Sequence, residues 1–172
     1  MKPSLIHIYK GDGKGKTTAA MGLAARALGA GLRVAVACFL KDGSSSELTI
    51  LRSHERCTVL PCPASVPFSN RMSDEERLYF SEWYHALTND ILRLSSQVDV
   101  LILDEVLDAI ELGFVEESAV VSLCTADDHP EIVLTGHHVR DSLLKNADYI
   151  TTMQADRHPF NNGIVARHGI EY

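Results

Sequence analysis

The chain has 172 residues, of which 45% are hydrophobic and 23% are charged, as in an ordinary globular protein. The net charge of −7 provides no general basic surface, which argues against a nucleic-acid partner. No apolar run approaches the ~20 residues of a membrane span, so we expect no membrane segment and a cytoplasmic protein. The length suits one domain with its own core, spanning residues 1–172.

The first motif is a glycine-rich turn between an apolar run (5–9) and an Ala-rich segment (17–28), which predict a strand and a helix. The turn contains Gly11, Asp12, Gly13, Lys14, Gly15, Lys16, Thr17 and Thr18. Such a loop directs backbone N–H groups and the positive end of a helix at one anion. Lys16 is then placed to reach the outer phosphates of a nucleotide, and the Thr17 hydroxyl to bind Mg²⁺. Lys10 occupies the first glycine position of the general motif, and a turn without a ligand is the alternative interpretation.

The next stretch predicts alternating strands and helices. Arg26 is a lone charge on the first helix, and it either lies on the solvated face or points toward the nucleotide. The continuous apolar run 34–40 predicts a parallel strand buried on both faces. A short helix over 47–54 and a strand over 58–60 follow. The proline-containing segment 61–70 then predicts a loop, of the kind that often serves as a lid or binding loop.

A long helix follows, and its start is signalled by a capping box. Ser73 is the expected N-cap and Glu76 its partner, and the helix should run to about Ser95. Its expected apolar side consists of Leu78, Phe80, Trp83, Leu87, Ile91 and Leu94. We interpret Trp83 as a core residue, with a ligand platform as the alternative.

The apolar run 98–103 predicts a second buried strand, and Asp104 and Glu105 follow it. An acid at the carboxyl end of such a strand is the usual partner of a phosphate loop, because that end opens beside the bound Mg²⁺. Alone, the same pair could simply begin the next helix. Together with the loop, it predicts the acidic side of a nucleotide site.

The remaining elements complete an alternating pattern. Residues 131–135 predict a third buried strand, 139–146 a short helix and 149–153 a last strand, before a polar tail over about 156–172 that we expect near the site. His137 and His138 follow the third strand, but successive residues point opposite ways, which disfavours a two-histidine metal site. The pattern predicts a single α/β domain with a mostly parallel sheet flanked by helices.

The cysteines predict free thiols. Two of the four are close in sequence, but no second pair accompanies them, so a zinc site is unsupported. The four residues are Cys38, Cys57, Cys62 and Cys124.

Segments at both ends and in the middle of the chain carry a resemblance to a known family. They are residues 11–20, 25–29, 39–41, 103–105, 134–136, 158–160, Gly163 and 169–172. In this order they resemble the ATP:corrinoid adenosyltransferases, also called cob(I)alamin adenosyltransferases. The family's loop is typically Gly-Asn-Gly-Lys-Gly-Lys-Thr-Thr and also lacks the first glycine. The resemblance implies a P-loop NTPase-like (RecA-like) domain.

The resemblance also implies the chemistry. In this family a Co(I) corrinoid attacks the 5′ carbon of ATP and triphosphate leaves whole, so no catalytic base is needed. Loop residues 11–18 would then bind ATP, with Lys16, Thr17 and Glu105 as catalytic residues. Mg²⁺ would be held by Thr17, Asp104 and Glu105, the acids acting directly or through water.

Four further residues match family positions around the substrates. Arg26 and Lys41 match positions near the nucleotide. Phe68 matches an aromatic position in a Phe-Thr-Trp segment of the family, where this chain has Asn70 in place of the tryptophan. His137 stands where the family usually has arginine.

These departures leave two alternatives open. One is an ATP-binding member that has lost catalysis and acts as a sensor or carrier, and the other is an ordinary P-loop ATPase or kinase. Family members also usually carry glutamine where this chain has Cys38. The resemblance implies a homodimer as the active form and a flavoprotein reductant as a candidate partner.

Overall fold

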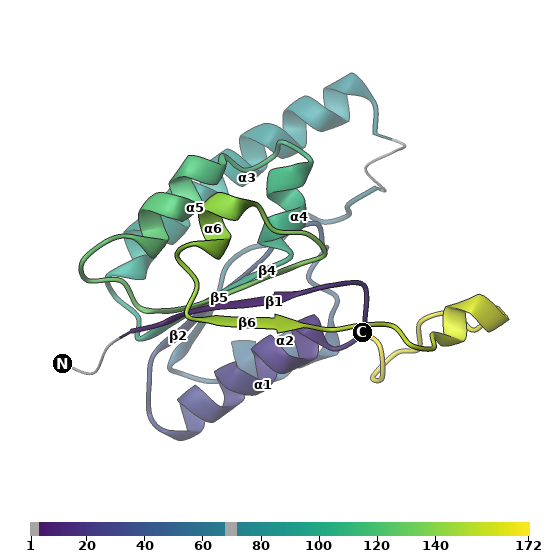
Figure 1. Cartoon of the computed structure of the whole chain (residues 1–172), viewed down its shortest axis with the longest axis horizontal. Helices are drawn as coiled ribbons and strands as arrows, with labels where there is room; N and C mark the ends of the chain where they lie inside the picture. The colour runs from purple at the N-terminus through teal and green to yellow at the C-terminus, as the bar shows by residue number, and fades with distance from the viewer. Residues whose placement is uncertain (1–3, 68–71) are drawn as a thin grey trace.

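A six-stranded sheet forms the centre of the molecule (Figure 1), in a computed structural model that describes residues 4–67 and 72–172. Its strands are β1 (Ile6–Lys10), β2 (Val34–Cys38), β3 (Cys57–Val59), β4 (Val100–Asp104), β5 (Glu131–Gly136) and β6 (Tyr149–Thr152). Their order across the sheet is β3-β2-β4-β5-β1-β6, and every pairing is parallel. The predicted α/β fold is therefore confirmed. No helix in the described part is both long and apolar enough to cross a membrane.

Helices cover both faces of this sheet. One face carries α1 (Lys16–Gly29) and α2 (Ser46–Arg52), and the other carries α3 (Asp74–Ser95), α4 (Val106–Glu111), α5 (Glu117–Cys124) and α6 (Asp141–Leu144) (Figure 1). The strands supply both cores, because their side chains alternate between the faces. Val34 and Val36 pack with α1, whereas Ala35 and Ala37 pack with α3. The strands are therefore packed from both faces, which fixes the positions of their ends.

Several predicted boundaries move by a few residues. β2 ends at Cys38 rather than Leu40, and the short helix after β5 is a single turn. The structure adds α4 and α5, which were not predicted, and a short 3₁₀-helix in the tail, Pro159–Asn162. Residues 61–67 of the predicted loop contain neither helix nor strand, and Phe68 and Asn70 lie outside the described residues.

The long helix α3 begins as predicted. The Ser73 hydroxyl accepts from the Glu76 N–H, and the Glu76 carboxylate accepts from the Ser73 N–H, so the capping box is complete. Its fully buried side chains are Phe80, Tyr84, Leu87 and Ile91, and Trp83 packs against this core as predicted. Leu78 was wrongly assigned to the apolar side. It is 62% exposed. Leu78 lies two residues before the buried Phe80, and a separation of two residues places side chains on nearly opposite sides of a helix.

Tyr84 connects α3 to the end of β2. Leu40 adopts a left-handed backbone with φ of 55°, a conformation that costs a branched side chain free energy. Its N–H donates to the Tyr84 hydroxyl over 2.9 Å. Burial raises the pKa of Tyr84 to about 12, so this hydroxyl stays neutral at ordinary pH. The contact turns the chain sharply after β2 and directs Lys41 toward the neighbouring strand.

We expect Tyr84→Phe to lower the free energy of unfolding by about 1–3 kcal/mol, because the Leu40 N–H loses its acceptor inside the protein. Urea denaturation measures the change. Tyr79→Phe is the matched control, since Tyr79 lies on the same helix but is 51% exposed, and it should change stability by less than about 0.5 kcal/mol. Equal stability of the two variants would contradict the role of this hydrogen bond.

Candidate active site

The phosphate loop joins β1 to α1 and is folded tightly against the end of β6. Gly11 and Gly15 have φ of 111° and 114°, values that favour glycine. A Cβ on Gly11 would lie 2.3 Å from the Met153 oxygen, and one on Gly13 would lie 2.7 Å from the Gln154 carbonyl. The Gly13 N–H donates to the Met153 oxygen over 2.8 Å. Close approach of two backbones therefore requires glycine at positions 11 and 13.

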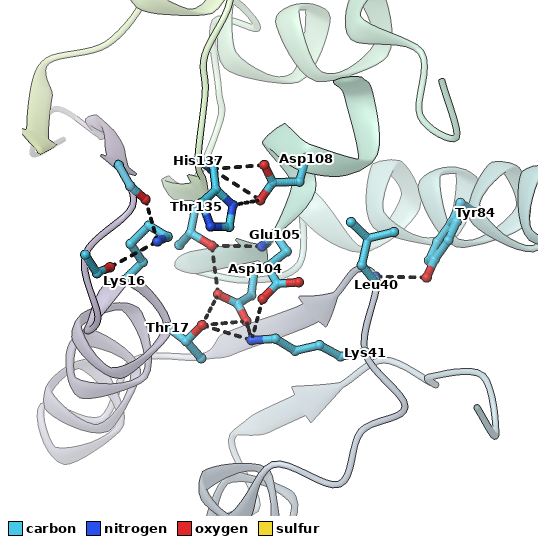
Figure 2. Close-up of polar contacts among 12 residues, drawn as sticks. Lys16, Thr17, Leu40, Lys41, Tyr84, Asp104, Glu105, Asp108, Thr135 and His137 are labelled. Carbon is cyan, nitrogen blue, oxygen red and sulfur yellow. Dashed lines mark hydrogen bonds and ion pairs between the residues drawn. The ribbon is translucent and has the colours of Figure 1, made fainter. Parts of the chain in front are cut away.

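Lys16 lies over this loop. Its ammonium donates to the Gly11 oxygen over 2.6 Å and to the Gly13 oxygen over 3.1 Å (Figure 2). The charge is thus held at the concave side of the loop, beside the first N–H groups of α1. A phosphate group at this position would meet the ammonium and the helix terminus together.

A second cationic group lies beside it, at the carboxyl end of β4. The Lys41 ammonium is 2.6 Å from Asp104 Oδ2, 3.2 Å from Glu105 Oε1 and 2.9 Å from Thr17 Oγ1 (Figure 2). The Thr17 hydroxyl donates to the Asp104 carboxylate over 3.0 Å. Asp104 is fully buried, so its negative charge depends on such close polar partners. The structure brings together all three residues predicted to hold a metal.

These groups shift each other's titration. Burial works to lower the pKa of Lys41, but the charges of Asp104 and Glu105 outweigh it and hold that pKa above its usual range. Burial raises the pKa of Glu105, against the attraction of Lys41. The site therefore keeps one full positive charge against two acids.

This donor set fits Mg²⁺. Its oxygens belong to one hydroxyl and two carboxylates, which are the ligand types that Mg²⁺ prefers, and an ammonium already lies among them as a stand-in cation. No group of three or more His, Cys, Asp or Glu side chains among the described residues could hold a metal by itself. Mg²⁺ commonly uses one or two carboxylates and completes its shell with water and substrate phosphates.

A hydroxyl also holds the acidic pair in position. Glu105 has a left-handed φ of 60°, and its N–H donates to Thr135 Oγ1 over 2.8 Å. Thr135 in turn donates to Asp104 Oδ1 over 2.8 Å. Thr135 was not predicted as a site residue, although it lies within a segment that carries the family resemblance.

His137 lies at the end of β5, next to the loop. Its carbonyl accepts from the Gly11 N–H over 3.1 Å, and its ring Nδ1 lies 3.0 Å from Asp108 Oδ2. Asp108 also accepts from the His137 N–H over 3.0 Å, and it was missed because only the fold brings α4 beside β5. His138 is exposed, and no metal-binding cluster in the described part includes either histidine.

One predicted residue, Arg26, is not brought to the site. Arg26 is exposed in the last turn of α1, about 15 Å along the helix from Lys16, which favours the interpretation as a solvated face residue. It lines a different cavity, together with Arg33 and Glu131 at the other end of the sheet. Phe68 lies outside the described residues.

A cavity of about 790 Å³ opens beside Lys41. Thr17, Thr18, Lys41 and Glu105 lie along it, and the last residues of the chain, 169–172, form another part of its wall. Lys14 reaches these residues, since its ammonium lies 3.3 Å from the Ile170 oxygen and 3.6 Å from the Glu171 carboxylate. The start of α1, Glu105 and the tail thus line one space, whose volume is typical of a small-molecule site.

Comparisons with known proteins identify relatives of this chain. The corrinoid adenosyltransferase of Escherichia coli (strain K12) is 30% identical over 171 residues, covering 98% of this chain and 85% of that protein. Corrinoid adenosyltransferase CobA of Salmonella typhimurium is 29% identical over 171 residues, with the same coverage. A solved structure of ATPases 2 and 3 of EssC from Geobacillus thermodenitrificans aligns with a TM-score of 0.49 at 15% identity. That alignment covers 98% of this chain and 36% of the EssC chain.

A model of the family described as ATP:corrinoid adenosyltransferase BtuR/CobO/CobP matches residues 2–172. The match spans the phosphate loop, the acidic pair after β4 and the C-terminal wall of the cavity. The chain therefore belongs to the ATP:corrinoid adenosyltransferase BtuR/CobO/CobP family.

Proposed function

We propose that this chain transfers the 5′-deoxyadenosyl group of ATP to the Co(I) centre of a corrinoid and releases triphosphate. Membership of the family supports the activity. The observation in this structure that carries it is the junction of the phosphate loop with the acidic end of β4. There the Thr17 hydroxyl bonds to the Asp104 carboxylate, and the Lys41 ammonium contacts both residues.

In this proposal the loop anchors the triphosphate. The backbone N–H groups of residues 14–18 and the Lys16 ammonium bind the phosphate oxygens, which supplies both position and charge, while the N–H groups of Gly11 and Gly13 hold the loop in shape. Mg²⁺ would be held by Thr17, Asp104 and Glu105, and when bound it would neutralise charge on the leaving triphosphate. Lys41, released from the acidic pair, then turns to the phosphates as a second cation.

The reaction needs no protein nucleophile, because the corrinoid brings one. The Co(I) centre attacks the 5′ carbon of ATP, a cobalt–carbon bond forms, and the bond from that carbon to the triphosphate oxygen breaks. The triphosphate leaves with the electron pair. The protein residues therefore act by holding the carbon in line with the attacking centre and by stabilising the leaving group.

We further propose that the cavity beside Lys41 holds the adenosine part of the nucleotide, next to the loop that binds its phosphates. Its position between α1 and residues 169–172 supports a single nucleotide-binding domain, residues 1–172, whose tail over about 156–172 forms part of the site. Phe68 and His137 would lie toward the substrates. The family resemblance supports a homodimer as the active form and a flavoprotein as the source of the electron.

Product analysis tests this function directly. Purified protein with MgATP and a corrinoid reduced to Co(I) should give an adenosylated corrinoid, detected by its absorption spectrum, and triphosphate in equal amount. Release of ADP and inorganic phosphate would instead indicate an ATPase or kinase. Calorimetric binding of ATP by a folded protein that binds no corrinoid would indicate a sensor or carrier.

We expect Lys16→Ala to abolish turnover and to weaken ATP binding at least about tenfold, because the loop loses its charged hydrogen bonds to phosphate. Isothermal titration calorimetry measures the binding, and circular dichroism verifies the fold. Lys145→Ala is the control, since this exposed lysine lies at the end of α6 and should leave both quantities unchanged. Full ATP affinity in Lys16→Ala would remove the phosphate role of the loop.

We expect Lys41→Met to destabilise the Mg²⁺-free protein by about 2 kcal/mol, because buried Asp104 loses its counter-charge. Added MgCl₂ should stabilise the variant more than the original protein, since the metal then supplies the missing charge without competition from the ammonium. Urea denaturation with and without MgCl₂ measures both effects. An identical response of the two proteins to Mg²⁺ would contradict the metal site.

A further inference from the structure

Residues 167–172 fold on themselves into a compact turn, which we call the tail turn. The Glu171 N–H donates to the Arg167 oxygen over 2.9 Å. The Gly169 N–H donates to the Tyr172 oxygen over 2.7 Å. The Arg167 guanidinium also donates to both oxygens of the Glu171 carboxylate, over 3.0 Å each. This hydrogen bonding lowers the pKa of Glu171 to about 2, so the carboxylate stays charged at ordinary pH. The tail turn is therefore braced from within.

Two separate parts of the domain attach the tail turn. The first is the phosphate loop, where the Lys14 ammonium lies 3.6 Å from the Glu171 carboxylate in addition to its hydrogen bond with the turn's backbone. The second is the start of α2, where the Ser46 hydroxyl donates to the Tyr172 oxygen over 3.1 Å. Residues 169–172 line the cavity beside Lys41, so the tail turn crosses one side of this cavity from the loop to α2.

Polar contacts, rather than a hydrophobic core, hold the tail turn in place. Every residue from 162 to 172 is exposed, and the apolar side chains of Ile164, Val165 and Ile170 are 51%, 72% and 58% exposed. Residues 164–167, which lead into the tail turn, contain neither helix nor strand. Figure 1 shows this yellow segment leaving the domain beyond β6 and returning toward it at the end of the chain. Exposed ion pairs and hydrogen bonds are individually weak, so a segment held by a few of them opens and closes readily.

We propose that the tail turn is a lid that closes the cavity over a bound nucleotide, and that Lys14 and Ser46 are the positioning residues that hold it shut. This inference rests on the proposed function, which places the adenosine in this cavity. While the tail turn is attached, it keeps the adenosine in place as the loop holds the phosphates. When it detaches, residues 169–172 no longer wall the cavity, and the nucleotide exchanges with the solvent.

Limited trypsin digestion of the nucleotide-free protein tests the attachment. Cleavage after Arg167 removes most of the tail turn, and mass spectrometry follows the loss. We expect Ser46→Ala and Lys14→Ala each to accelerate this cleavage several-fold, because the tail turn then spends more time detached. Ser122→Ala is the matched control for the serine, since Ser122 is exposed on α5, on the other face of the sheet, and should leave the rate unchanged. An unchanged rate in Ser46→Ala would overturn the proposal. An equal acceleration after Arg52 would also overturn it, because α2 itself would then have loosened.

Nucleotide release tests the closing role. The magnesium complex of 2-aminopurine riboside triphosphate, a fluorescent isomer of ATP, is bound to the protein and displaced by excess MgATP in a stopped-flow experiment. We expect Arg167→Met to release it several-fold faster, because the Glu171 carboxylate loses its brace. The described lining of the cavity does not include Arg167, so this effect reaches the nucleotide through the tail turn.

Arg93→Met is the control for this measurement. Arg93 is likewise exposed and paired with an acid, but on α3, and its replacement should leave the release rate unchanged. Equal release rates in Arg167→Met and the original protein would overturn the closing role. Failure of the original protein to bind any nucleotide would instead count against the proposed function, since the digestion reports on the tail turn without a nucleotide.

Discussion

The site depends on the attraction between the Lys41 ammonium and the carboxylates of Asp104 and Glu105. This attraction holds together the carboxyl ends of β2 and β4. The acids come from the end of β4, the lysine follows β2, and Thr17 joins them from the start of α1. A fully buried carboxylate without a positive charge nearby has a high desolvation cost. A cation at this point therefore stabilises the folded chain, and Lys41 supplies one.

The fold was predictable where the information is local. Apolar runs located all six strands, and the capping box located the start of α3, because each depends on neighbours in sequence. The helices α4 and α5 were missed for the opposite reason. α4 has six residues and is buried on nearly every side, so it has no amphipathic period, and α5 spans about two turns. Likewise β2 ends early because Tyr84, from a distant helix, holds Leu40 in a left-handed turn.

The site was predictable in its residue types and less so in its contacts. The loop and the acidic pair follow from motif and strand context, and the fold brings them together. The ion pair of Lys41 with Asp104 joins residues 63 positions apart and depends on β2 lying beside β4, which hydrophobic periodicity does not specify. The contact between Asp108 and His137 also depends on the tertiary fold, which places α4 beside β5. Arg26 is the opposite case. It is close to the loop in sequence, but the rise of α1 carries it away from the loop in space.

The glycines at positions 11 and 13 have a consequence for how the molecule is made. They let the phosphate loop lie directly on the backbone of Met153 and Gln154, and Gly13 hydrogen-bonds to Met153 there. The ribosome produces the loop long before it produces this support. A nascent chain thus carries an unsupported loop until β6 and the two residues after it have emerged.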